Sequence, residues 1–154
     1  MSSPNQWKTE QITLRPITSH NFQECIDLQL APGQETWVAS NLYSIAQAKA
    51  DPCRKPFAIY VGEEMVGFVM YNDEPLEDGT YRLSRLMIDR RHQGKGYGRT
   101  VTLEIINRLR KIPYCREITL DFVPENLAAA HLYNSLGFKI VEETEHEIVA
   151  KFRL

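Results

Sequence analysis

The sequence has little of what would build a disulfide framework, a zinc site or a membrane anchor. Its 154 residues include three cysteines, Cys25, Cys53 and Cys115, which are far apart and form no CxxC or Cys/His motif. Neither disulfides nor a zinc site are therefore expected. No apolar run approaches the roughly 20 residues that span a bilayer, and residues 1–8 lack the apolar core of a secretory signal. We expect a cytoplasmic protein that binds no metal and no membrane.

The sequence also lacks an excess of charge. Its formal net charge is −2, whereas dedicated nucleic-acid binders are usually basic, so the expected partner is a small molecule and not a nucleic acid. With 43% hydrophobic and 25% charged residues, the composition is that of an ordinary globular protein. No linker, repeat or low-complexity segment interrupts it. We therefore expect one domain over residues 1–154.

The spacing of apolar residues predicts an α+β domain. Alternating or continuous apolar residues predict strands, and apolar residues every three or four positions predict helices. The expected strands are 12–17, 57–61, 65–71, 81–88, 118–122, 139–142 and 147–152, and the expected helices are 22–30, 35–50, one containing 101–109 and one beginning at Asn126. A strand, a crossover helix and a further strand over 81–122 require a parallel pair, whereas hairpins are antiparallel. The central sheet should therefore be mixed and mostly antiparallel, with flanking helices.

A glycine-rich segment directly behind the expected strand 81–88 predicts an anion site. It reads Arg91-His92-Gln93-Gly94-Lys95-Gly96-Tyr97-Gly98-Arg99. Glycines at a strand-to-helix junction allow successive backbone N–H groups to face an anion at the positive end of the helix. The segment therefore predicts a phosphate-binding loop, with a plain tight turn as the alternative. Lys95 and Arg99 would either offset phosphate charge or lie at the surface as solvated cations.

A second motif further along the chain supports the interpretation of the glycine-rich segment. Residues 123–138 place Asn126 at an expected helix start and end in Tyr133-x-x-x-Gly137-Phe138. Together with Gln93-x-x-Gly96-x-Gly98, this segment resembles the GNAT superfamily of N-acetyltransferases, in the order and at the separation of that family's two half-sites. The resemblance implies a GNAT-like fold and acetyl-CoA as the cofactor.

The resemblance also implies which residues contact the coenzyme. The pantetheine arm would pair with the backbone of the central strand as an extra strand would, and the pyrophosphate would lie on the glycine loop. The expected cofactor-binding residues are Leu86, Met87, Ile88, Gln93, Gly94, Lys95, Gly96, Tyr97, Gly98, Arg99, Asn126, Ala129 and Tyr133. For Asn126, capping of its helix alone is an equal alternative.

Tyr133 is the expected catalytic acid. Ala128, Leu132 and Leu136 form one stripe at i, i+4 spacing, and Ala129 and Tyr133 form an adjacent stripe, so the tyrosine is free to point beside the core. The resemblance implies that it donates a proton to the departing thiolate. Because a thiol has a pKa of about 8.5 and a tyrosine of about 10, hydrogen-bond donation is one alternative and a purely structural tyrosine is another.

The general base is harder to identify. Many GNAT enzymes place a glutamate on the central strand, but residues 81–88 read YRLSRLMI and contain no carboxylate. Glu35, at the start of the expected helix 35–50, is the candidate base, and a water chain that ends at Glu77 or Asp78 is the alternative. His92 and His131 are expected to be exposed histidines outside the chemistry.

A narrower likeness concerns the acceptor amine. Residues 37–48, 85–89 and 93–98 resemble bacterial diamine and spermine/spermidine N-acetyltransferases. The expected acceptor-binding residues are Glu35, Trp37, Tyr43, Tyr81 and Arg85, and the acidic loop 73–78 could add charge. Arg82 and Arg85 argue against a cationic acceptor unless acids neutralise them. A polyamine or diamine is favoured, with a peptide amino terminus, a lysine or an amino sugar as further acceptors. A non-catalytic acyl-CoA sensor and a homodimer also stay open.

Overall fold

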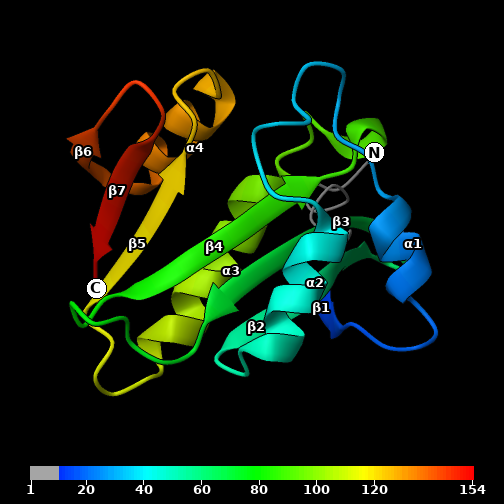
Figure 1. Cartoon of the computed structure of the whole chain (residues 1–154), viewed down its shortest axis with the longest axis horizontal. Coiled ribbons are helices and arrows are strands. Elements are labelled where there is room, and N and C mark those ends of the chain that lie inside the picture. Colours follow the sequence, from blue (N-terminus) through cyan, green and yellow to red (C-terminus); the bar gives the residue numbers. More distant parts are fainter. Residues whose placement is uncertain (1–10) are drawn as a thin grey trace, which may run out of the picture.

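The computed structural model describes residues 11–154, so the expectation for residues 1–8 lies outside the described part (Figure 1). The element order is β1 (Ile12–Pro16), α1 (Phe22–Asp27), α2 (Asn41–Ala50), β2 (Arg54–Val61), β3 (Glu64–Asn72), β4 (Tyr81–Ile88), the 3-10 turn Arg90–His92, α3 (Tyr97–Arg110), β5 (Glu117–Phe122), α4 (Leu127–Leu136), β6 (Lys139–Glu143) and β7 (Ile148–Arg153). Within residues 11–154, no helix has the length and apolar character needed to cross a membrane.

A seven-stranded sheet in the order β1-β2-β3-β4-β5-β7-β6 runs through the molecule. The β4–β5 pair is parallel, and the other neighbouring strands pair antiparallel. The helix α3 makes the crossover between the two parallel strands, as such a pair requires. The predicted α+β class with a mixed, mostly antiparallel sheet is therefore confirmed.

Helices cover both faces of the sheet. Figure 1 shows α1 and α2 in front of it and α3 behind it. Behind the sheet, Val101, Ile105 and Leu109 of α3 pack with strand residues in the larger buried cluster, which also contains Tyr133 of α4. In front, Cys25 of α1 packs with Phe68 and other buried strand residues in a smaller cluster. Both faces of the central strands are therefore apolar, as their near-continuous hydrophobic sequence predicts.

Two helices are shorter than their periodicity predicts. The helix α1 ends at Asp27 and not at Leu30, because Gln29 is held elsewhere: its N–H donates to Asp89 at 2.9 Å and its carbonyl accepts from the Arg90 N–H at 2.7 Å. The prediction of a helix from Glu35 is wrong, because α2 begins at Asn41. Ser40 caps that helix, accepting from the Tyr43 N–H at 3.0 Å, and serine is among the strongest N-cap residues.

The strands β4 and β5 diverge soon after they meet. Their pairing is confined to Tyr81–Ile118 and Arg82–Thr119, after which β5 stays paired with β7 through Phe122. On its other side β4 pairs with β3 through a bulge that leaves Ser84 opposite no residue, and the Ser84 hydroxyl donates to the Met70 carbonyl at 3.0 Å. A bulge bends a strand and increases its twist. An opening results between residues 83–88 of β4 and residues 120–122 of β5, here called the β4/β5 fork.

Candidate active site

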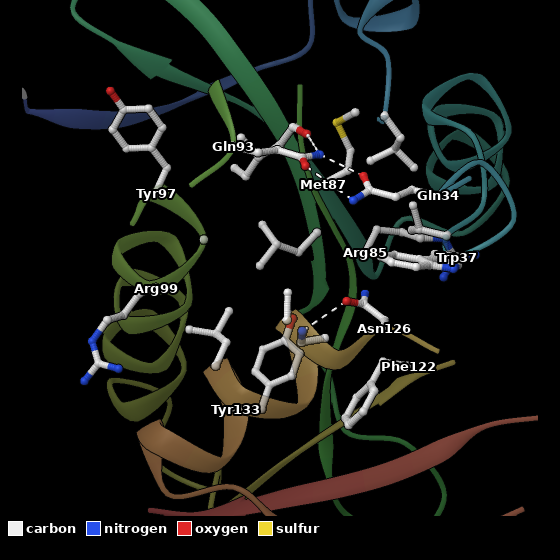
Figure 2. Close-up of a pocket in the computed structure, with 18 of the residues that line it drawn as sticks. Gln34, Trp37, Arg85, Met87, Gln93, Tyr97, Arg99, Phe122, Asn126 and Tyr133 are labelled. Atoms are coloured by element: carbon white, nitrogen blue, oxygen red, sulfur yellow. Dashed lines mark hydrogen bonds between the residues drawn. The ribbon is translucent and has the colours of Figure 1, made fainter. Parts of the chain in front are cut away.

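A cavity of about 460 Å³ lies in the β4/β5 fork. Its walls come from both strands, from the loop and first turn of α3, from α4 and from the loop before α2. Figure 2 shows Tyr97 and Arg99 on one side of this cavity, Trp37 and Arg85 on the opposite side, and Asn126 and Tyr133 between them. We call the two sides the glycine end (residues 94–99) and the arginine end (Trp37, Val38, Arg85 and Asp121).

The glycine end presents the positive terminus of a helix to the cavity. Gly94 and Gly96 have φ values of +77° and +83°, a left-handed conformation that residues with a Cβ rarely adopt. Gly96 is the N-cap of α3, so the N–H groups of the first helical turn are directed out of the helix at the glycine end. Such a terminus binds phosphate through these N–H groups and the helix dipole. Gly94, Gly96, Tyr97, Gly98 and Arg99 lie on the cavity wall.

Arg99 and Lys95, the two cations within residues 94–99, differ in whether they line the cavity. Arg99 is on the cavity wall and exposed, and its guanidinium donates to the Ser135 hydroxyl at 2.7 Å. Lys95 is exposed and does not line the cavity. Of the two, Arg99 is therefore the cation placed to meet a phosphate in the cavity.

Gln93 connects the loop to the segment before α2. Its amide nitrogen donates to the Gln34 side-chain oxygen at 2.9 Å and to the Ile88 carbonyl at 3.0 Å (Figure 2). The buried carboxylate of Asp89 makes a second connection, accepting from the Gln29 N–H and from the N–H and Nε of Arg91. Burial alone would raise the pKa of Asp89, but these hydrogen bonds outweigh it and lower the pKa below its usual value. The loop is thus anchored on both sides.

The middle of the cavity is a strand edge lined by apolar side chains. Leu86, Met87 and Ile88 of β4 form its wall, with Leu120 and Phe122 of β5 opposite. Because β5 has diverged, backbone groups on this side of β4 have no strand partner, so an extended ligand can add to the edge through main-chain hydrogen bonds.

Tyr133 lies on the wall between the two ends, and it also belongs to the core. Its ring packs at 5.8 Å from Phe122 and at 5.5 Å from Phe138, measured between centroids, and the residue is 8% exposed. The expectation that it lies beside the core and not within it is therefore too simple, because an aromatic cluster surrounds the ring while it points into the cavity (Figure 2). Burial, and then the charge of Asp121, raise the pKa of the phenol, so the hydroxyl stays protonated at neutral pH and can donate a hydrogen bond.

Asn126 and Ala129 form the adjacent wall at the start of α4. The Asn126 side-chain oxygen accepts from the Ala129 N–H at 3.0 Å and so caps the helix, while Asn126 itself lines the cavity. This cap uses the oxygen and leaves the amide nitrogen available to a ligand.

The arginine end combines an aromatic ring with charged groups. Trp37 and Val38 come from the loop before α2 and are half-buried. Arg85 of β4 is also half-buried, and its two terminal nitrogens donate to the Ser84 carbonyl at 2.8 Å and to the Gln47 side-chain oxygen at 3.0 Å. Asp121 of β5 forms an ion pair of 2.6 Å with Arg82.

The other expected acceptor residues lie away from this cavity. Glu35 is exposed, accepts from the Gly33 N–H at 2.9 Å and lines a neighbouring cavity of about 390 Å³. Tyr43 is 57% exposed on α2, whereas Tyr81 is 3% exposed within the core. Neither tyrosine lines the cavity. The structure thus brings Trp37 and Arg85 together and leaves Glu35, Tyr43 and Tyr81 apart from them.

The remaining acid and base candidates lie outside the cavity or, for His92, depart from expectation. Glu77 and Asp78 are exposed and outside the cavity, and Asp78 is hydrogen-bonded to Thr80. His92 is 8% exposed, not solvent-exposed as expected, because the 3-10 turn after β4 brings its Nε2 to 3.3 Å from a Glu64 oxygen. His131 is exposed, as expected.

Sequence reasoning missed Asp121, the one carboxylate on the cavity wall within residues 11–154. The signal was present, because an aspartate between Leu120 and Phe122 interrupts a strand whose other face is buried, and its side chain must then point to the opposite face. In the same part of the chain, no group of three or more histidine, cysteine or acidic residues could hold a metal ion.

These features suit one class of protein, an enzyme with an extended, phosphate-bearing ligand, because a helix N-terminus, a strand edge and a tyrosine line one cavity. The family model "Acetyltransferase (GNAT) family" matches residues 22–138. The chain belongs to this family of acetyltransferases, whose cosubstrate is acetyl-CoA.

Known relatives differ in the acceptors that their names give. The spermine/spermidine N(1)-acetyltransferase of Bacillus subtilis is 30% identical over 139 residues, which cover 87% of this chain and 91% of that protein. N-acetylaspartate synthetase of Xenopus tropicalis is 33% identical over 73 residues, 47% of this chain and 27% of that protein. The solved structure of Vibrio cholerae spermidine N-acetyltransferase with CoA and spermine covers 92% of this chain and 93% of its own, at 20% identity and a TM-score of 0.71.

Proposed function

We propose that this enzyme transfers the acetyl group of acetyl-CoA directly to the primary amine of a small molecule. The observation that carries the proposal is the cavity in the β4/β5 fork, which joins an anion-binding helix terminus to an end where a tryptophan, an arginine and an aspartate converge. The predicted coenzyme contacts fit this arrangement, because the N-terminus of α3 with its helix dipole suits a pyrophosphate, and the edge of β4 that faces the fork suits a pantetheine arm. The thioester supplies an acyl carbon already activated toward an amine.

The Tyr133 hydroxyl donates a hydrogen bond to the departing sulfur and stabilises the negative charge that develops on it. Its raised pKa keeps the phenol protonated, and its place between the glycine and arginine ends is where the thioester of a ligand bound along β4 would lie. Main-chain N–H groups of β4 are available on the same side to polarise the acyl oxygen. Both interactions grow stronger as charge develops on sulfur and oxygen, which is the condition for lowering a barrier.

Asp121 accepts the proton that the attacking nitrogen loses. An alkylamine of pKa about 10.4 is mostly protonated at pH 7, so an acceptor for this proton is required. Asp121 suits the role better than Glu35, because it lines the cavity and its charge is close enough to affect the Tyr133 pKa. Only the neutral amine has the lone pair that attacks, so the ammonium proton leaves first, to the Asp121 carboxylate directly or through one water. As the carbon–nitrogen bond forms and the carbon–sulfur bond breaks, the nitrogen loses a second proton to solvent and the sulfur departs as the thiolate.

Two acceptor classes have support. The names of two relatives that match most of the chain favour a polyamine such as spermidine, and Trp37 offers an aromatic face to an ammonium group. A specific observation favours a second class, an amine that carries a carboxylate: Arg85 at the arginine end has no acidic partner within residues 11–154.

A thiol-release assay tests the proposal. Acetyl-CoA would be mixed with the enzyme and a panel of amines, with detection of free CoA thiol and of the acetylated product by mass spectrometry. Amine-dependent release with one acetylated amine per thiol is the expected result. Binding of acetyl-CoA without release for any amine would instead support a non-catalytic coenzyme sensor.

A further inference from the structure

Arg85 is a cation that the protein itself does not neutralise. Its hydrogen-bond partners, the Ser84 carbonyl and the Gln47 amide oxygen, are uncharged. Within residues 11–154 it forms no ion pair, and its Nε is buried with no hydrogen-bond partner. Each terminal nitrogen of a guanidinium carries two hydrogens, so each keeps one donor after these bonds are made. Buried charges are normally paired, and one that lines a cavity is therefore a candidate ligand contact.

The groups around Arg85 do not neutralise it. Burial, followed by the charges of Arg54 and Arg82, lowers the pKa of Arg85, while the charge of Asp121 acts in the opposite direction. Arg54 and Arg82 each have an acidic partner, Asp51 at 3.3 Å and Asp121 at 2.6 Å. The two nearby ion pairs are therefore close to neutral, and the charge of Arg85 remains.

No acid on the cavity wall is free to attract a second ammonium group. Asp121 is paired with Arg82, and Glu35 lies in the neighbouring cavity with its carboxylate on the Gly33 N–H. A polyamine that placed a distal ammonium at the arginine end would meet the Arg85 charge there, whereas an anionic group would be stabilised by it.

We propose that Arg85 is a specificity-determining residue that binds a carboxylate of the acceptor. The acceptor would then be an amino acid or a related amino-carboxylate. This inference rests on the proposed acetyl transfer and departs from the polyamine acceptor named for the relatives. A guanidinium edge with two remaining N–H donors matches a planar carboxylate in both charge and geometry. Carboxylate binding would also fix the distance from the reacting amine to Arg85, and thereby hold the nitrogen at the thioester.

Matched acceptor pairs test the inference. 4-Aminobutyrate and 1,4-diaminobutane have the same chain length and the same reacting amine, and differ in a distal carboxylate or ammonium. Lysine and 1,5-diaminopentane differ only in the carboxylate. We expect the wild-type kcat/KM to be higher for the carboxylate member of at least one pair, and the ratio within that pair to fall roughly tenfold or more in Arg85→Gln. Preference for both diamines, or a ratio that Arg85→Gln leaves unchanged, would overturn the proposal.

A second variant keeps the arginine in place. Gln47→Glu is nearly isosteric and would put a carboxylate on the Arg85 guanidinium at a contact that is now 3.0 Å. It should abolish the carboxylate preference as Arg85→Gln does, even if Arg85→Gln fails to fold. Lys49→Gln removes one exposed positive charge from the same helix as Gln47 and should leave the ratio unchanged; an equal change in this control would contradict a local role for Arg85.

The assay separates this inference from the proposed function. If no amine in the panel releases thiol, acetyl transfer itself is contradicted. If diamines release thiol faster than their amino-carboxylate partners in the wild type, acetyl transfer stands and the carboxylate role of Arg85 is refuted.

Discussion

The glycine end and the arginine end of one cavity are built by different means. At the glycine end, backbone groups of a single continuous segment make the site, and two left-handed glycines set its shape. At the arginine end, side chains from β4, β5 and the loop before α2 converge, and Asp121 and Arg85 each contact a side chain of another element, Arg82 of β4 and Gln47 of α2. The backbone-built end suits a ligand shared by a whole family, whereas the side-chain-built end can change its acceptor by changing single residues.

The largest expected effect is on kcat, and it decides whether Asp121 or Glu35 is the general base. Asp121→Asn should lower kcat by roughly 10²- to 10⁴-fold, as expected for loss of a general base, whereas Glu35→Gln should change it less than about twofold because Glu35 lies outside the cavity. Steady-state kinetics at saturating acetyl-CoA measure both. Arg82→Gln is the control for the broken ion pair. A severe defect in Glu35→Gln together with a mild one in Asp121→Asn would reverse the assignment.

The next largest effect is also on kcat, and it concerns Tyr133, which lies between the glycine end and the arginine end. Tyr133→Phe keeps the ring that packs on Phe122 and Phe138, so unfolding by urea should change little, while kcat falls roughly ten- to a thousandfold. Because the Tyr133 pKa is raised, wild-type activity should climb with pH as the acceptor amine deprotonates, with no loss from ionisation of the phenol near pH 10. Unchanged turnover in Tyr133→Phe, measured where chemistry limits the rate, would leave the tyrosine with a packing role only.

A matched pair of glycine variants tests the glycine end. Gly96→Ala and Gly62→Ala both place a Cβ at a left-handed φ, +83° and +60°, with no atom within 4 Å, so each should destabilise the fold by about 1 kcal/mol. Gly96→Ala should in addition weaken acetyl-CoA binding roughly tenfold, because Gly96 lines the cavity at the helix terminus proposed to bind the phosphates, whereas Gly62 does not line it. Calorimetric titration measures this. Equal coenzyme affinity in the two variants would mean that the loop is only a turn.

The contrast also explains what the sequence alone could predict. The glycine loop and the α4 motif were recognisable because a local backbone conformation needs particular residues at fixed spacing. The arginine end was not recognisable in this way. Glu35 was expected at a helix start, but Ser40 caps α2 five positions later, and Asp121 reaches the cavity only because β4 and β5 separate after Arg82. Neither the divergence of two strands nor a long-range hydrogen bond, such as the one from the Gln29 N–H to the Asp89 carboxylate, leaves a periodic signal in a single sequence.

The smallest expected effect is on stability, and it concerns Asp89, which anchors the loop at the glycine end to Gln29. Asp89→Asn replaces one of the two carboxylate oxygens with an NH2 group, so the N–H of either Gln29 or Arg91 loses its acceptor, and the fold should be destabilised by about 1–3 kcal/mol in urea unfolding at pH 7. Because the pKa of Asp89 is lowered in the folded state, its contribution is complete above the pKa of about 3.9 in the unfolded chain and is lost as the pH falls through the folded-state value. The difference between variant and wild type should therefore shrink toward pH 3. A constant difference across this range would contradict the role of the ionised carboxylate.

Amine-dependent release of CoA thiol by the wild-type enzyme tests the central claim most directly, because it requires both ends of the cavity to act on one reaction. The account predicts no release above background from acetyl-CoA alone, and one acetylated amine per thiol when an acceptor that fits the arginine end is added. If acetyl-CoA raises the melting temperature, as a ligand of the native state must, but no diamine, polyamine or amino-carboxylate releases thiol, the assignment of the fork as an acetyl-transfer site is contradicted.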